Sequence, residues 1–334
     1  MSSHDTSECW AMVCDGPGQA LRREDCAVPS PGYGEVLVKV LACGVCRTDL
    51  HVVDGDIPAI YPIVPGHEIV GEVIETGSDV TGIARGMRIG VPWLGRTCGK
   101  CDYCRSGQEN LCDDPIFTGA TRDGGYATHA IADAQFCFPL PEGLSDCETA
   151  PLLCAGLIGW RAYRMAGEGK RLGLYGFGAA AHILAQVALA DGRRVFAFTR
   201  EGDTASQDFA RDLGCEWAGS SSSNPGEELD AAIIFAPVGA LVPAALKAVR
   251  KGGRIICAGI HMSEIPAFPY TDLWGERSIK SVANLTRADG TGFLTAEHTA
   301  SIKMHTTQYA LEDANRALSD LREGRLQGAA VLVP

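Results

Sequence analysis

The chain has 334 residues, which is more than one small hydrophobic core needs and favours two domains. Hydrophobic residues make up 46% and charged residues 21% of it, as in an ordinary globular protein. Its net charge of −12 argues against a nucleic acid as partner. No apolar run approaches a membrane span, and the first residues lack the basic and apolar regions of a secretory signal, so we expect a cytoplasmic protein.

The pattern of residues 1–150 predicts short strands separated by glycine and proline. Runs of apolar residues predict strands at 35–44, 69–77 and 88–93, and punctuation such as PSPGYGE is typical of a loop-rich β region. We therefore expect a β-rich domain over 1–154, with a small cysteine-rich lobe at 95–113.

From about residue 152 strands alternate with helices. The pattern predicts strands at 171–175, 193–200, 230–237 and 254–260, an alanine-rich helix after the first of them, and further helices at 203–215 and 241–253. This alternation predicts an α/β, doubly wound parallel sheet over 155–284. The final segment, 285–334, ends in a helix and a strand, and we expect that short strand to return to the sheet of the first domain.

The cysteines favour metal sites. Fourteen cysteines without a secretory signal point to reduced thiols and metal ligands more than to disulfides. Four fall within the fifteen residues CGKCDYCRSGQENLC, and tight two-residue spacings let thiolates share one ion. Four thiolates complete a closed, structural zinc shell, with iron–sulfur ligation as the alternative. The expected ligands are Cys98, Cys101, Cys104 and Cys112.

Other cysteines are isolated in the sequence. Examples are Cys9, Cys137, Cys215 and Cys257. Since an isolated cysteine is typically a small buried apolar side chain, we expect these four to pack in the core.

A glycine-rich turn marks a candidate nucleotide site. The stretch GLYGFGAAAH follows a predicted strand and opens a helix, so its glycines permit a tight turn and close approach to a pyrophosphate at the helix N-terminus. We expect cofactor contacts from this turn and from the ends of later strands, at Gly176, Phe177, Gly178, Ala179, Ala236, Ala258 and Gly259.

The next strand ends in Thr199 and Arg200, where an acid would hold the ribose 2′-hydroxyl of NAD. A hydroxyl and a guanidinium suit a 2′-phosphate, so we favour NADP. Two alternatives stay open: Arg200 solvates the rim or stacks on adenine, and Glu201 serves the ribose.

The stretches GVCRTDLH and GHE carry the residues of a candidate catalytic site. If a hydride carrier binds in the second domain, the first domain should hold the substrate where a proton can leave. An alcohol does not readily lose its proton at neutral pH, and a Lewis acid lowers the barrier to that loss. A catalytic zinc needs three protein ligands and an open position. Cys46 and His67 are candidates, and Cys154, where the chain passes between the domains, is the third.

Together these motifs resemble the zinc-dependent medium-chain alcohol dehydrogenases, in particular bacterial enzymes that favour small primary alcohols. The likeness runs from about Val13 to the C-terminus and comprises GVCRTDLH, GHEIVGEV, GVPWLG, the four-cysteine lobe, CAG and the glycine-rich turn, in the family's order. It implies a GroES-like β-rich catalytic domain, a Rossmann cofactor domain, two zinc ions per chain and NAD(P). It also implies a homo-dimer or homo-tetramer built by cofactor-domain edge strands such as KSVANL.

The resemblance also implies roles for single residues. Cys46, His67 and Cys154 bind the catalytic zinc, while Thr48 takes the alcohol's proton and passes it through the ribose to His51.

Four further residues surround that zinc in the family. Asp49 supports the ligand histidine, and Glu68 is the carboxylate behind the metal that can approach it during ligand exchange. Trp93 and Ile57 line the substrate pocket.

One departure from the family lies in the last strand. Related enzymes often carry an arginine there that contacts the pyrophosphate, whereas this chain has Gly328 and Ala329, so Arg325 is the candidate substitute.

Two other functions stay open: a quinone or enone reductase of the same fold, which needs no catalytic zinc, and a zinc-stabilised, nucleotide-binding redox sensor without turnover.

Overall fold

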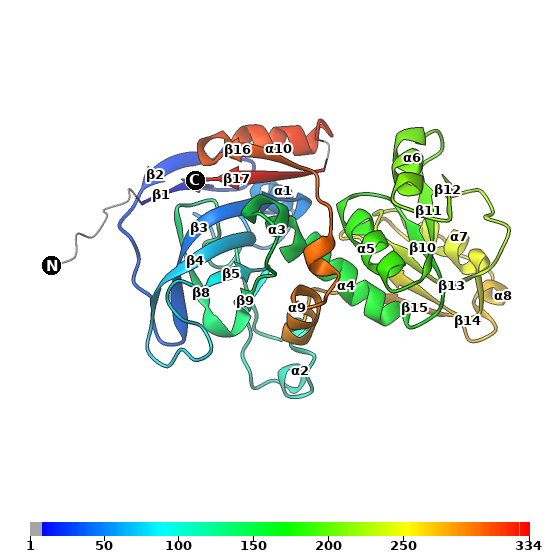
Figure 1. Cartoon of the computed structure of the whole chain (residues 1–334), viewed down its shortest axis with the longest axis horizontal. Coiled ribbons are helices and arrows are strands. Elements are labelled where there is room, and N and C mark those ends of the chain that lie inside the picture. Colours follow the sequence, from blue (N-terminus) through cyan, green and yellow to red (C-terminus); the bar gives the residue numbers. More distant parts are fainter. Residues whose placement is uncertain (1–8, 327) are drawn as a thin grey trace. The chain divides into compact units, whose positions relative to one another are not determined.

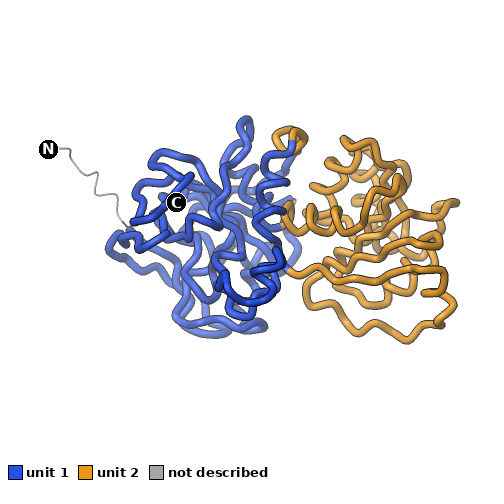
Figure 2. Tube along the Cα trace, turned by 90° about the horizontal axis from the view of Figure 1, so that it is seen from below, with its two compact units in different colours: residues 1–154, 284–296, 303–334 blue, residues 155–283, 297–302 orange. Residues whose placement is uncertain are grey.

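The computed structural model describes residues 9–326 and 328–334. The chain divides into two compact units, coloured separately in Figure 2. Unit 1 comprises Met1–Cys154, Asn284–Ala296 and Lys303–Pro334, and unit 2 comprises Ala155–Ala283 and Glu297–Ile302. The division expected from the sequence differs in that it placed residue 284 in the cofactor domain and 297–302 with the C-terminal segment.

Unit 1 is built around a mixed β-sheet (Figure 1). Its strands are β1 (Trp10–Val13), β2 (Arg22–Asp25), β3 (Glu35–Val45), β4 (Glu68–Thr76), β5 (Arg88–Val91), β6 (Leu94–Arg96), β7 (Ile116–Phe117), β8 (His129–Asp133), β9 (Phe138–Pro139), β16 (Thr306–Ala310) and β17 (Ala329–Val333). Its helices and 3-10 turns are α1 (Arg47–Asp54), α2 (Asp102–Arg105), η1 (Glu109–Leu111), η2 (Ala134–Phe136), α3 (Asp146–Thr149), η3 (Ala150–Leu153), α9 (Arg287–Leu294), η5 (Leu311–Asp313) and α10 (Ala314–Arg322).

The long strand β3 organises that sheet. The order is β16-β17-β3-β4-β5-β9, and β8 pairs with the first half of β3 while β17 pairs antiparallel with its last residues. The strands predicted at 35–44, 69–77 and 88–93 are confirmed as β3, β4 and β5. Because β3 is apolar on both faces, its side chains are buried among β1, β4, β8, α10 and β17, in the core of unit 1.

Unit 2 is a doubly wound α/β unit, as the alternation of elements predicted. Its strands are β10 (Arg171–Tyr175), β11 (Arg194–Thr199), β12 (Trp217–Ser220), β13 (Leu229–Ile234), β14 (Val249–Cys257) and β15 (Ser278–Ser281), all paired in parallel in the order β12-β11-β10-β13-β14-β15. Its helices are α4 (Ala155–Ala166), α5 (Ala179–Ala190), α6 (Thr204–Asp212), α7 (Leu241–Ala248), α8 (Tyr270–Leu273) and the turn η4 (Thr299–Ser301).

One helix prediction runs too far. The sequence predicted a helix over 241–253, whereas α7 ends at Ala248 and β14 begins at Val249. Gly252 and Gly253 are poor helix formers, and Gly252 has a left-handed φ of 72°. The side chain of Arg250 donates to Asp230 of β13, which holds this segment beside the neighbouring strand instead.

The strand order places a topological switch point at the carboxyl ends of β10 and β13. From β10 the chain first adds β11 and β12 on one side of the sheet, and it then crosses to add β13, β14 and β15 on the other side. Ligands of open parallel sheets bind at such a topological switch point.

Within the part of the chain that the structure describes, no helix is long and apolar enough to cross a membrane.

Candidate functional site

The first turn of α1 fixes the position of Cys46. Cys46 is the N-cap of this helix, and its Sγ accepts a hydrogen bond from the backbone N–H of Thr48, at 3.3 Å. Its own N–H donates to Oδ2 of Asp49, at 2.8 Å, which completes a capping box. A thiol that caps a helix N-terminus is held with its sulfur beside backbone donors, an arrangement that favours the thiolate.

His67 meets Cys46 from the start of β4. Its side chain is fully buried, with Nδ1 3.0 Å from Oδ1 of Asp49 and Nε2 3.3 Å from Sγ of Cys46. Asp49 therefore holds one ring nitrogen and turns the other towards the sulfur. A carboxylate in this position fixes the tautomer of a ligand histidine.

Cys154 and Glu68 complete the cluster. Cys154 follows η3, and its Sγ lies 3.9 Å from Sγ of Cys46. The ligand atoms of Cys46, His67, Glu68 and Cys154 all lie within 4.8 Å of one another. Two sulfurs bound to one tetrahedral zinc at about 2.3 Å stand about 3.8 Å apart, so this donor set fits that ion.

Burial and mutual contacts shift the titration of this cluster strongly. The hydrogen bond from Cys154 and the neighbouring imidazole of His67 hold the pKa of the Cys46 thiol well below its usual value, against the effect of burial. The pKa of Cys154 is raised by the same hydrogen bond and by burial. Burial, followed by the charge of Cys46, raises the pKa of Glu68. A divalent cation would replace these protons, because it stabilises thiolate and carboxylate together.

Gly44 makes room for Glu68. A Cβ at Gly44 would lie 1.8 Å from Oε2 of Glu68, whose side chain is only 3% exposed. Sequence reasoning did not single out this glycine, although it stands in the GVC motif two residues before Cys46. Its lack of a side chain lets a buried carboxylate reach the metal ligands.

Tyr126 is a second neighbour that the sequence did not reveal. Its side chain is fully buried, and within the described residues its hydroxyl has no hydrogen-bond partner. Burial and the nearby Asp49 and Cys43 raise its pKa far above normal, so it stays neutral. Cys43 itself is fully buried and belongs to neither group of potential metal ligands among the described residues, as expected of a packing residue.

Thr48 and His51 share one face of α1. They lie three residues apart in the helix, and such residues are neighbours on its surface. Thr48 is half-buried, while the side chain of His51 is 24% exposed and its Nδ1 lies 2.9 Å from Oδ2 of Asp56. His51 is therefore partly open to solvent, one helical turn after Thr48.

Aromatic rings form one wall of the site. Trp93 stands edge-on to His67, with ring centroids 5.2 Å apart at 81°, and stacks on Phe117 at 5.0 Å. Trp93 is thus a direct neighbour of a metal ligand, and Phe117 is a wall residue that sequence reasoning missed. Ile57 is half-buried and packs against the core of unit 1, with no contact to the cluster given by the structure.

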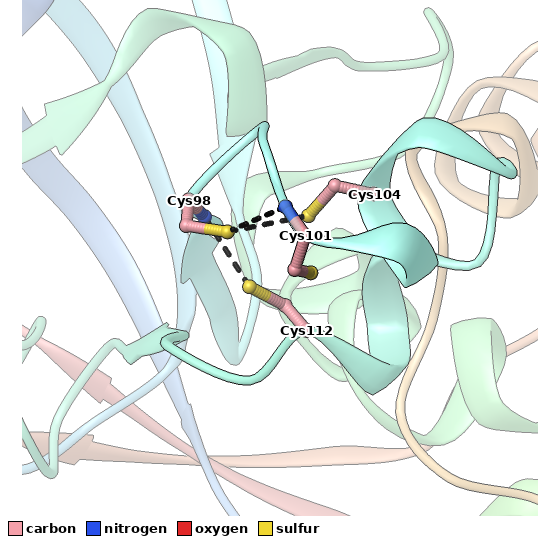
Figure 3. A group of neighbouring side chains, drawn as sticks. All are labelled: Cys98, Cys101, Cys104 and Cys112. Atoms are coloured by element: carbon pink, nitrogen blue, oxygen red, sulfur yellow. Dashed lines mark hydrogen bonds between the residues drawn. The ribbon is translucent and has the colours of Figure 1, made fainter.

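The second cysteine cluster is formed by side chains of unit 1 that lie close together beside α2, Cys98, Cys101, Cys104 and Cys112 (Figure 3). Its four sulfurs lie within 4.8 Å of one another, and those of Cys98 and Cys104 are 3.9 Å apart. Backbone N–H groups of Lys100 and Cys101 lower the pKa of Cys98 to about 6, whereas burial raises that of Cys112 to about 12. Four sulfurs leave no open position, so a zinc held here is structural.

The glycine-rich turn follows β10, at the switch point of the sheet of unit 2. Gly176 has a left-handed φ of 88°, and a Cβ there would lie 2.9 Å from the backbone nitrogen of Ala236. A Cβ on Gly259 would likewise lie 2.9 Å from the carbonyl oxygen of Phe235. Gly178 is the N-cap of α5, and the helix N-terminus faces outwards from the turn with no side-chain cap. Backbone donors at this end suit a pyrophosphate.

The hydroxyl of Thr199 has hydrogen-bond partners within unit 2. Its side chain is 4% exposed, donates to the carbonyl oxygen of Arg200 at 3.0 Å and accepts a hydrogen bond from Gln207 at 2.9 Å. A hydroxyl engaged on both sides within the fold has no remaining proton to donate to a phosphate. The contact of Thr199 with a 2′-phosphate stays a prediction, and Arg200, which is exposed, is the more accessible of the two candidates.

Two residues before the last strand, Arg325 and Gly328, bear on the arginine that related enzymes often carry there. Arg325 pairs with Asp320, at 2.8 Å, and with Glu323, so its guanidinium is already engaged on the surface of unit 1. A Cβ at Gly328 would lie 1.9 Å from the carbonyl oxygen of His305. An arginine cannot replace Gly328 without moving the β16 side of the sheet.

Comparisons with known proteins agree on one family. The model of the alcohol dehydrogenase GroES-like domain matches residues 32–142. A probable alcohol dehydrogenase, AdhA, of Mycobacterium tuberculosis (strain CDC 1551 / Oshkosh) is 48% identical over 339 residues, which cover 98% of this chain and 97% of that protein. The cobalt- and zinc-bound thermostable alcohol dehydrogenase of Pyrobaculum aerophilum superposes with a TM-score of 0.86 at 27% identity, over 98% of this chain and 100% of that one. Acetophenone reductase of Geotrichum candidum NBRC 4597, in complex with NAD, gives a TM-score of 0.85 at 26% identity, over 100% and 99%.

Proposed function

Since the chain belongs to the zinc-type medium-chain alcohol dehydrogenases, we propose that it transfers hydride reversibly between a small primary alcohol and NAD(P). The observation that carries this proposal is the buried set of two thiols and one imidazole, Cys46, Cys154 and His67, backed by Glu68. Such a ligand set with an open position is that of a catalytic zinc. A quinone or enone reductase of this fold does not need it.

Zinc held by these residues would supply a Lewis acid that makes an alcohol more acidic. The chain's own residues then handle the proton. The hydroxyl of Thr48 accepts it, and His51, on the same face of α1, releases it to solvent beside Asp56. Trp93 and Phe117 give the site an apolar wall, which favours a small alkyl or aryl substrate and keeps water away.

The activity test uses the absorbance of reduced nicotinamide after addition of 1-propanol or benzyl alcohol. We expect turnover by the wild type and by Cys215→Ser, a matched variant that removes a buried cysteine outside both clusters. His67→Ala and Cys154→Ser should reduce kcat by at least about a hundredfold, as loss of a metal ligand requires. Full turnover by His67→Ala would reject the proposed metal centre.

Cofactor choice is a separate proposal, in favour of NADP. The exposed guanidinium of Arg200 supports it, because a guanidinium binds a phosphate and has no acceptor for the proton of a ribose hydroxyl. We expect kcat/KM to be higher with NADP than with NAD in the wild type. Arg200→Ala should lower the NADP value about tenfold and leave the NAD value nearly unchanged. A wild-type preference for NAD would contradict the assignment.

We further propose that the protein is cytoplasmic and forms a dimer or tetramer with copies of itself. The edge strand β15 is partly exposed, and Tyr270 and Trp274 of the same unit are 67% and 64% exposed. An unpaired edge strand beside exposed aromatic rings suits pairing with a second copy. Sedimentation equilibrium checks the assembly: a monomer at micromolar concentration would contradict it. Cell fractionation checks the location.

A further inference from the structure

Two cysteines outside both metal clusters face each other at the start of the described chain. Strands β1 and β2 are antiparallel, with Trp10 opposite Asp25. The next pair outwards is Cys9 opposite Cys26, and the backbone N–H of Cys26 donates to the carbonyl oxygen of Cys9 at 2.8 Å. Their Sγ atoms are 2.8 Å apart. This is closer than even the ordinary contact of two carbon atoms, about 3.5–4.0 Å.

A metal site does not account for this pair. Within residues 9–326 and 328–334, groups of three or more potential ligands occur only at the two clusters described above. Two thiols without further ligands do not complete a zinc shell. A disulfide suits the backbone better: hydrogen-bonded antiparallel partners have Cα atoms about 5.5 Å apart, which is the separation that disulfides favour.

A cavity beside the pair gives a reagent access. It has a volume of about 410 Å³ and is lined by Cys9, Cys26, Glu24, Arg122 and other residues of unit 1. Cys26 is exposed, whereas Cys9 is only 8% exposed. A small disulfide can therefore reach the pair at Cys26.

We propose that Cys9 and Cys26 form a reversible disulfide, made by exchange with a low-molecular-weight disulfide. A cysteine thiolate attacks one sulfur of the reagent, and the reagent's S–S bond breaks to release one thiolate. The second cysteine then attacks the protein sulfur of this mixed disulfide and expels the other half as a second thiolate. The two protein thiols lose two electrons, the reagent gains them, and the two protons pass to the released thiolates.

The crosslink fastens a strand that lies behind the metal ligands. The N–H of Met12 in β1 donates to the carbonyl oxygen of Tyr126, at 2.8 Å, and that of Thr128 donates to Trp10, at 3.0 Å. The ring of Tyr126 in turn lies against Gly66, where an added Cβ would be 2.4 Å from it. Joining β1 to β2 therefore restrains one side of the scaffold beside His67.

The reaction is expected to be slow. Desolvation, followed by the adjacent Cys9, raises the pKa of Cys26 to about 12, so little of it is thiolate at neutral pH. We expect the disulfide to form over minutes to hours, as uncatalysed exchange does. The pair thus acts as a slow response to oxidising conditions.

The test incubates the full-length, zinc-loaded protein with oxidised glutathione and follows intact mass and non-reduced peptides. We expect the loss of two hydrogens, a peptide that links Cys9 to Cys26, and reversal by dithiothreitol. Cys9→Ser and Cys26→Ser should each abolish the linked peptide, while Cys215→Ser should keep it. Amide exchange in β1 should slow at least several-fold after oxidation of the wild type and stay unchanged in Cys9→Ser.

Two results would overturn the proposal. One is the absence of the linked peptide from the wild type after prolonged incubation. The other is a stable mixed disulfide at Cys26, which would show that Cys9 does not attack it. Because these readouts do not depend on alcohol oxidation, they are independent of the proposed activity.

Discussion

Cys46 combines three contacts that only a short polar side chain at a helix start can make. It caps α1, faces Nε2 of His67 and lies within reach of Cys154. The residue pattern around it could be found from the sequence, since the order of Cys, Thr, Asp and His is distinctive. The buried neighbours Gly44 and Tyr126 could not, because a glycine in a strand and a tyrosine before one carry no chemical signature of their own.

Gly44 offers a test of the space around Glu68. Gly44→Ala would place a Cβ 1.8 Å from a carboxylate oxygen in a buried site, so the side chain of Glu68 must move. Overpacking of this kind costs about 1–3 kcal/mol of stability. We expect a lower denaturation midpoint and a several-fold lower kcat, measured by denaturant titration and steady-state kinetics.

The control for this variant is Gly159→Ala in α4, where the nearest atom to an added Cβ lies 3.5 Å away. That variant should be neutral or slightly more stable, because alanine is the better helix former. Equal behaviour of the two variants would mean that Gly44 is not required by Glu68.

Thr199 shows what residue chemistry alone leaves out. Its position at the end of β11 and its hydroxyl predict a phosphate contact, and the structure adds that neighbouring groups also bind that hydroxyl. Such competition depends on Gln207, in the following helix α6, and on the backbone of Arg200. The sequence does not show that these groups converge on it.

At the scale of elements, an ion-pair network joins the amino-terminal parts of three strands in unit 2. Asp230 of β13 accepts hydrogen bonds from the backbone and side chain of Arg171, in β10, and from Arg250, in β14. Burial raises the pKa of Asp230, but these hydrogen bonds outweigh it and hold the pKa well below its ordinary value. The side chain is only 11% exposed, so solvent screens these contacts weakly.

This network gives unit 2 a predictable acid sensitivity. Because the folded-state pKa is depressed, the stabilisation is fully present above the unfolded pKa of about 3.9 and is lost as pH falls through the folded value. We expect Asp230→Asn to destabilise unit 2 by roughly 1–3 kcal/mol at neutral pH and to reduce its loss of stability below about pH 5. Amide exchange in β10 and β13, measured across pH, checks both effects.

Asp208→Asn is the matched control, since Asp208 pairs with Arg211 on the surface and its side chain is 70% exposed. Exposed pairs contribute little, so this variant should behave as the wild type. If Asp230→Asn matched it at every pH, the network would have no role in stability.

The success of element prediction followed the strength of the pattern. Strands β3, β4 and β5 and the alternation in unit 2 have long apolar runs with glycine punctuation, and they were found. The β1–β2 hairpin was not, because β2 is the exposed stretch RRED, which has no apolar alternation. Its pairing depends on β1 and on ion pairs such as Arg22 with Asp15, which are tertiary features.

At the scale of the whole molecule, the two units divide the chemistry. Unit 1 holds both cysteine clusters, and unit 2 holds the glycine-rich turn at the switch point of a parallel sheet. This division is visible in the sequence as a change from β punctuation to strand–helix alternation near residue 152. The identity of the substrate is not visible in the sequence. Residues near the metal cluster such as Phe117 come from loops and short strands, which have weak hydrophobic patterns.

The metal content of the pure, active protein tests the central claim most directly. We expect two zinc ions per chain in the wild type, since the structure forms two separate clusters of suitable ligands. His67→Ala should retain one ion, held by the four-cysteine lobe, and lose turnover. An active wild-type protein that holds a single ion, bound in the lobe, would contradict the account.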